Sequence, residues 1–237
     1  MKIQLAQRMA EEFLGTAFLV AAVIGSGIMG ERLAGGNAAI ALLANTIATG
    51  AALVALILAF GPISGAHFNP VVTLADWIEA GMTPGDAMGY ACAQILGGAS
   101  GAIVANLMFG LPAVSISHHA PRSGAAQVFS EFIATFGLIS VIWGCAKAKT
   151  GMAAFAVGGY IAAAYWFTAS TSFANPAVTV ARSLSDSFAG IRPQDVTAFI
   201  VAQVAGALAA TYVFRWLMPG MPTAAKNVVV PHDTERK

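Results

Sequence analysis

The dipeptide Asn-Pro occurs twice inside long apolar regions, in GAHFNPVVTLAD at residues 65–76 and in TSFANPAVTVAR at residues 171–182. Asn is a preferred helix N-cap, and Pro suits the first helical position, where its missing N–H would have no partner. Each dipeptide therefore predicts that a helix begins there, over about 69–80 and about 175–187. Neither stretch is long enough to cross a bilayer, so two short helices are expected to start at membrane depth.

Six other apolar stretches are each about 20 residues long, the length that a helix needs to cross a bilayer. The chain is 57% apolar and only 10% charged, whereas soluble domains carry about 25% charged residues. The sequence therefore predicts an all-α membrane protein with six transmembrane helices and two re-entrant half-helices. The spans are expected at about 8–28, 38–60, 87–109, 128–147, 153–172 and 196–217.

The two halves of the chain resemble each other. AEEFLGTAFLV at 10–20 resembles SEFIATFGLIS at 130–140, and ACAQILGGA at 91–99 resembles VAQVAGALA at 201–209. Three spans in each half make the second copy inverted in the membrane, and inverted repeats with broken helices place a permeation site near the midplane. We expect one channel domain over 1–237, with repeats at about 8–109 and 128–217 and a polar cytoplasmic tail at 219–237.

The distribution of Lys and Arg predicts the orientation. Six spans put both termini on one side of the membrane. Arg32, Arg122, Arg182 and Arg192 fall on the other side, and the remaining Lys and Arg residues fall on the side of the termini. We therefore expect a multi-pass protein of a bacterial inner membrane, with both termini in the cytoplasm.

The paired motifs SGAHFNPVVT and FANPAVT, with Glu12 and Glu131 in the first span of each half, resemble the aquaporin (major intrinsic protein) family over nearly all of residues 8–217. The resemblance implies an hourglass of six spans, a homotetramer, and passive passage of small neutral solutes and water. The predicted pore motifs are Asn69, Pro70 and Val71, and Asn175, Pro176 and Ala177. The two Asn side chains are the expected pore donors, and the helix N-termini behind them disfavour cations.

The residue after the second motif is Val178, where most family members have Arg. Spacing from the two motifs, carried over from the family, places the selectivity filter at Thr49, Ala163, Ser172 and Val178. A shift of one turn would replace Ala163 by Tyr160 or Phe167, and an offset of one would replace Ser172 by Phe173. This predicted filter contains no charge, and we expect it to be wider and less polar than a water-selective filter.

The run YWFTASTSFANPAVT resembles a bacterial branch of the family found beside arsenic-resistance genes. That resemblance implies passage of glycerol and of neutral or methylated arsenic species. A mainly water-selective channel is an alternative.

Four charged or titratable residues have a predicted place near the pore. Glu12 and Glu131 are interpreted as hydrogen-bond acceptors that support the loop before each half-helix, although a proton relay in a secondary transporter is the alternative. His67 lies at one pore mouth and either lines it or bonds the loop. Arg182 lies at the other mouth, and the favoured interpretation is a rim charge that faces water or lipid headgroups.

Other classes of function have little support in the sequence. There is no nucleophile–base pair, so an enzyme is not expected. Cys92 and Cys145 have no CxxC spacing and no neighbouring His, so no metal site is predicted. No cofactor is expected, and no basic cluster suggests nucleic acid.

Overall fold

A computed structural model describes residues 3–118, 121–148 and 152–218. Eight helices lie in this part of the chain: α1 (Leu5–Leu33), α2 (Ala38–Ser64), α3 (Pro70–Ile78), α4 (Pro84–Met108), α5 (Ala125–Ala148), α6 (Ala153–Phe167), α7 (Pro176–Arg182) and α8 (Pro193–Leu217). By length and composition, α1, α2, α4, α5 and α8 can cross a membrane, whereas α6 is a shorter apolar helix. The predicted helical membrane fold is therefore confirmed, and the predicted tail at 219–237 lies outside the described residues.

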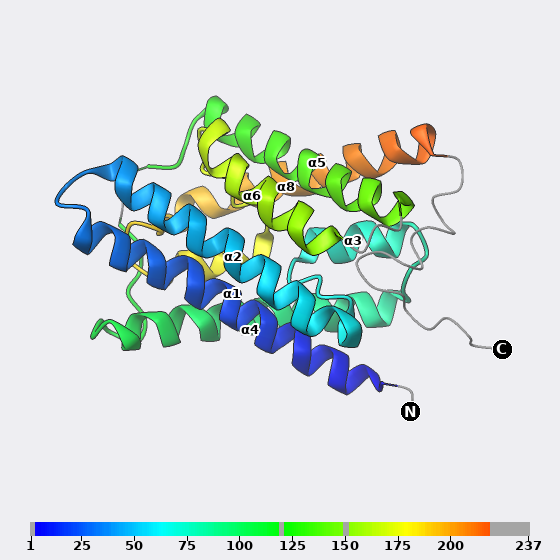
Figure 1. Ribbon diagram of the computed structural model, residues 1–237, viewed down its shortest axis with the longest axis horizontal. Coiled ribbons are helices and arrows are strands. Elements are labelled where there is room, and N and C mark those ends of the chain that lie inside the picture. Colours follow the sequence, from blue (N-terminus) through cyan, green and yellow to red (C-terminus); the bar gives the residue numbers. More distant parts are fainter. Residues whose placement is uncertain (1–2, 119–120, 149–151, 219–237) are drawn as a thin grey trace.

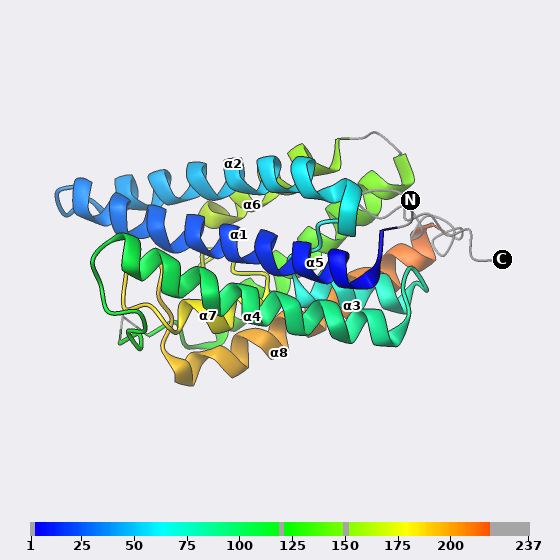
Figure 2. The same cartoon turned by 90° about the horizontal axis from the view of Figure 1, so that it is seen from below.

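The long helices lie lengthwise in the molecule, and the two short ones lie between them (Figure 1). Helix α1 packs against α2 and α4, and α5 packs in the same way against α6 and α8. Helices α3 and α7 occupy opposite halves of the molecule, with their first residues near its middle (Figure 2). The start of α1 and the end of α8 lie at one end, on the right in both views.

Two glycines allow α1 and α4 to approach closely. A Cβ added to Gly97 would lie 2.2 Å from the carbonyl oxygen of Phe13, and one added to Gly101 would lie 2.2 Å from that of Ala17. These glycines form the small-residue face that their spacing of four predicts. A Cβ added to Gly206 of α8 would meet Phe132 O of α5 at 2.4 Å, so the second half uses the same device.

The sequence overestimated the length of two elements beside the second loop. Helix α6 ends at Phe167 and not near 172, and α7 ends at Arg182 and not near 187. Thr168 has extended backbone, with φ −110° and ψ 139°. Apolar composition continues across this point, but residues 168–175 are held in a loop by side chains from other helices. Composition alone did not reveal those contacts.

Candidate functional site

The loops before α3 and α7 share one unusual backbone pattern. Gly65, Ala66 and Phe68 have φ values of 94°, 50° and 50°, and Thr171, Ser172 and Ala174 repeat the pattern at 62°, 51° and 49°. These residues lie four, three and one positions before Asn69 and before Asn175. Non-glycine residues in the left-handed region cost roughly 1–2 kcal/mol each, so other contacts must hold both loops in this conformation.

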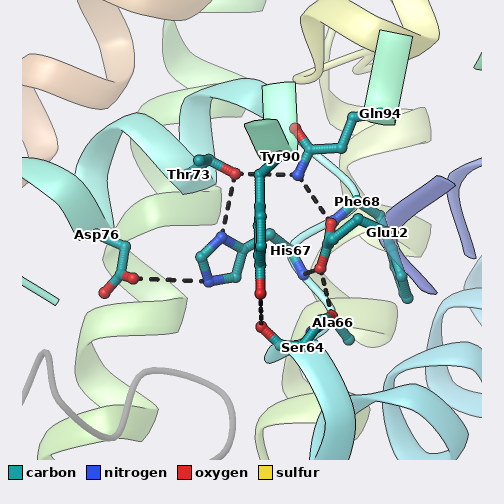
Figure 3. A network of polar contacts seen from close by, with 9 residues as sticks. All are labelled: Glu12, Ser64, Ala66, His67, Phe68, Thr73, Asp76, Tyr90 and Gln94. Atoms are coloured by element: carbon teal, nitrogen blue, oxygen red, sulfur yellow. Dashed lines mark hydrogen bonds and ion pairs between the residues drawn. The ribbon is translucent and has the colours of Figure 1, made fainter. Parts of the chain in front are cut away.

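Glu12 of α1 holds the first loop (Figure 3). Its Oε1 accepts from the backbone N–H of His67 at 2.8 Å and from the Ser64 hydroxyl at 2.5 Å. Its Oε2 accepts from the N–H of Phe68 at 2.7 Å and from Gln94 Nε2 at 2.8 Å. Four donors match the acceptor capacity of a carboxylate, which explains how this fully buried side chain is tolerated.

Glu131 of α5 holds the second loop in the same manner. Its Oε1 accepts from Phe173 N at 2.8 Å, and its Oε2 accepts from Ala174 N at 2.9 Å and from Gln203 Nε2 at 2.7 Å. The amide of Gln203 also donates to Thr179 Oγ1, as Gln94 donates to Thr73 Oγ1 in the first half. Gln94 and Gln203 make equivalent contacts in the two halves. The quoted repeat brings them to within one position of each other, so it could have indicated them as carboxylate partners.

The two Asn side chains join the half-helices to each other. Asn69 Oδ1 accepts from Val71 N at 3.1 Å, and Asn175 Oδ1 accepts from Ala177 N at 2.9 Å, so each Asn is the predicted N-cap. Asn69 Nδ2 donates 2.8 Å to Ala174 O, and Asn175 Nδ2 donates 2.8 Å to Phe68 O. Pro70 and Pro176 are the first residues of α3 and α7.

A cavity runs along this junction between the helices. Asn69, Asn175 and His67 line it, together with aliphatic side chains from α1, α2, α5 and α6. Val71 and Ala177 are buried but are not among its lining residues. The lining is largely apolar, and polar groups are concentrated at the two loops and at a few helix positions. An arrangement of this kind fits small neutral molecules better than ions, which need replacement for their hydration.

The residues predicted for a filter are placed as follows. Thr49, Ser172 and Val178 line the cavity, and each is at least 95% buried. Ala163 does not line it and lies on an exposed face of α6, so the register that we predicted for this helix is wrong. The count from Asn175 crosses the non-helical loop at 168–175, where a helical period does not apply.

Helix α6 lines the cavity with Val157, Ile161 and Tyr165, none of which the sequence argument chose. The Tyr165 hydroxyl lies 3.2 Å from Thr49 Oγ1. The alternatives Tyr160 and Phe167 also point elsewhere, because Tyr160 bonds to Ala134 O and Phe167 is 56% exposed. Phe173, considered as a replacement for Ser172, lines the cavity together with it.

The favoured interpretation of Arg182 as a rim charge is wrong. The side chain is 2% exposed and borders the cavity. Its Nε donates to Ala189 O, and the guanidinium carbon lies 3.4 Å from the centre of the Phe173 ring. The carbonyl and the ring draw the guanidinium inward, and neither contact is visible in a helix-face argument.

A second arginine, Arg122, connects the loop before α7 to the loop after it. It donates from Nε to Gly190 O at 2.9 Å, and from Nη1 to Ser170 O at 3.2 Å and to Thr171 Oγ1 at 3.3 Å. Its guanidinium carbon lies 5.2 Å from the Phe173 ring, on which Arg182 also packs. Burial lowers the pKa of Arg122 from its ordinary value. The loop hydrogen bonds compensate for the lost hydration of this charge.

His67 lines the cavity and contacts α3 and α4 (Figure 3). Its Nδ1 lies 3.1 Å from Thr73 Oγ1, and its Nε2 lies 3.8 Å from Asp76 Oδ2. Its ring packs edge-on against Tyr90, whose hydroxyl donates to Ser64 O. His67 therefore both lines the cavity and takes part in side-chain contacts, which combines the two alternatives that the sequence left open.

Comparison with known proteins agrees with this geometry. The family described as Major intrinsic protein matches residues 1–161 and 148–235. "Aquaglyceroporin AqpS" of Rhizobium meliloti is 48% identical over 222 residues, which cover 93% of this chain and 94% of that protein. "Aquaporin NIP1-4" of Oryza sativa subsp. japonica is 32% identical and is covered over 76% of its length.

A solved structure, that of the aquaglyceroporin from Plasmodium falciparum, superposes with a TM-score of 0.70. The match covers 93% of this chain and all of that chain at 18% identity, so it establishes the aquaporin fold. The chain belongs to the major intrinsic protein family. It is an integral, multi-pass membrane protein and a passive channel for small neutral solutes, not an enzyme.

Proposed function

We propose that the chain conducts water, glycerol and other small neutral solutes, including neutral and methylated arsenic hydroxides, through the cavity that passes the junction of α3 and α7. Asn69 and Asn175 act as pore donors, and Thr49, Ser172, Val178 and Tyr165 form the selectivity filter. The main support for this proposal is a cavity at the junction of two helix N-termini, which both Asn side chains line.

The lining supports passage of solutes wider than water. Val178 occupies the place where most members of the family carry Arg, and the Thr49–Tyr165 hydroxyl pair faces the same cavity. A solute with hydroxyl groups on one side and carbon on the other can bond to the hydroxyl pair while its apolar side contacts Val178. Glycerol and methylated arsenic hydroxides have this character. The name of the relative AqpS, an aquaglyceroporin, agrees with glycerol passage.

Passive conduction is favoured over coupled transport. A coupled transporter needs buried charges that are free to bind and release an ion. Glu12 and Glu131 are instead engaged by the loop N–H groups and by Gln94 and Gln203. We further propose a homotetramer in a bacterial inner membrane, one channel domain with the predicted repeats, and cytoplasmic termini.

Reconstitution in liposomes tests the function. Uptake of water, glycerol, arsenite as As(OH)₃ and a methylated arsenic hydroxide would be compared with protein-free vesicles, with and without a proton or sodium gradient. The proposal expects uptake of each solute down its own gradient and no response to the ion gradients. Accumulation of solute driven by either ion would support coupled transport, and a water-only flux would reject the wide filter.

A further inference from the structure

We infer that Arg182 supplies the fixed positive charge of the permeation path in this chain, and that the Phe173 ring holds it there. This makes Arg182, seven residues after Asn175, a determinant of cation exclusion in place of residue 178. The inference rests on the proposed function, because it concerns the same cavity.

The geometry of Arg182 supports this role. Its guanidinium carbon lies over the Phe173 ring, 3.4 Å from the ring centre, and both residues line the cavity. A guanidinium over an aromatic face is favoured electrostatically, most strongly where water is excluded. Phe173 is itself fixed by an edge-on contact with Phe199, at 5.2 Å between ring centres and 85° between planes. The charge is therefore held at a defined place on the cavity wall.

Arg122 and Arg182 both lie against the Phe173 ring, but their hydrogen bonds indicate different roles. Arg122 donates from Nε to Gly190 O and from Nη2 to Phe188 O, which follow α7, and from Nη1 to Ser170 O, which precedes it. These bonds make Arg122 a structural brace between the two loops. Within the described residues, the one hydrogen bond made by the Arg182 side chain is from Nε to Ala189 O. Neither Nη group donates to an acceptor in the described part of the protein. Their N–H groups and the positive charge are therefore available to solutes in the cavity that Arg182 lines.

The position of the charge matters for exclusion. Arg182 ends α7, whereas Asn175 caps its start, and α7 runs from the middle of the molecule toward the end opposite the chain termini (Figure 2). The charge therefore lies between the junction of the half-helices and that end. A cation that enters from that end meets Arg182 before it meets the two helix N-termini. In a wall of low polarity the repulsion is screened less than in water. Val178 can thus remain apolar, which preserves width for solutes, while the positive charge is retained nearby.

Three variants in liposomes distinguish this role of the charge from a purely structural role, in which Arg182 only holds the loop after α7 through its bond to Ala189 O. Arg182→Met removes the charge and retains a long apolar stem. Arg182→Lys retains the charge. Arg32→Gln is the matched control, because Arg32 is an exposed arginine at the same end of the molecule that does not line the cavity. Sodium, water and glycerol fluxes would be measured in the same vesicles, after checking expression and assembly.

Arg182→Met is expected to raise the ratio of sodium flux to water flux by about tenfold or more, because the lost charge repels sodium and does not repel neutral water. Arg182→Lys and Arg32→Gln are expected to exclude sodium as the parent does. Unchanged sodium exclusion in a conducting Arg182→Met protein would overturn the inference. Equal leaks in the Met and Lys variants would also overturn it, because a tether and not the charge would then be at work.

A further variant keeps the test decisive if Arg182→Met does not assemble. Phe173→Leu removes the aromatic support and leaves the arginine, so sodium flux should rise, by at least about threefold, as the guanidinium loses its place. An unchanged sodium flux in a folded Phe173→Leu channel contradicts the inference. Failure of the parent protein to pass water or glycerol would be a different result, because it rejects the proposed function itself.

Discussion

Glu131→Gln should loosen the loop before α7 at a calculable cost. The carboxylate receives two backbone N–H groups, from Phe173 at 2.8 Å and Ala174 at 2.9 Å, one on each oxygen, as well as the amide of Gln203 at 2.7 Å. A glutamine side chain has the same shape but only one acceptor oxygen. In either orientation its NH₂ group faces one of the two backbone N–H groups, which then has no acceptor.

The magnitude follows from this count. An unsatisfied buried donor costs about 1–3 kcal/mol, and each remaining bond loses about 1 kcal/mol when its acceptor is no longer charged. Removing the charge also recovers part of the cost of burying it. The net loss of stability is therefore about 2–4 kcal/mol. For a chain of this size that corresponds to roughly 4–15 °C in Tm.

The assay is thermal unfolding of the purified protein in detergent, followed by intrinsic fluorescence, together with water flux in liposomes. Glu31→Gln is the control, because Glu31 is an exposed carboxylate at the far end of α1, where a solvated polar contact contributes little to stability. Glu131→Gln should lower the apparent Tm and reduce flux, whereas Glu31→Gln should change the Tm by less than about 2 °C. If both variants unfold with the parent, Glu131 does not support the loop as argued.

Three further predictions concern packing and selectivity. Gly101→Ala should lower the free energy of unfolding by about 1–3 kcal/mol, because the added Cβ would lie 2.2 Å from Ala17 O. Gly159→Ala is the control and should be neutral or slightly stabilising, because nothing lies within 4 Å of its added Cβ. Equal shifts in apparent Tm for the two variants would contradict this prediction. Val178→Arg should lower the ratio of glycerol to water flux in liposomes, because a guanidinium narrows the cavity, and an unchanged or higher ratio in a well-assembled variant means that residue 178 does not control selectivity. Tyr165→Phe removes one hydroxyl from the cavity and should reduce glycerol flux by about 2–10-fold with little change in water flux; a parallel loss of both would refute a hydrogen-bonding role.

The sequence determined the features that depend on local chemistry. Asn-Pro predicted the starts of α3 and α7, because an N-cap acceptor and a residue without N–H are local requirements of a helix start. Apolar length predicted where the spans lie, to within a few residues at most ends. The repeat predicted that Glu12 and Glu131 have equivalent places, and both carboxylates contact the backbone of the following re-entrant loop.

Tertiary structure decided the direction in which side chains point. Ala163 faces outward and Tyr165 inward because the rotation of α6 is set by its packing on α2 and α5, and the sequence of α6 is apolar on every side. Arg182 turns inward because Ala189 O and the Phe173 ring reach it from separate parts of the chain. Such contacts join residues that are distant in sequence or separated by a non-helical loop, so helical spacing alone does not predict them.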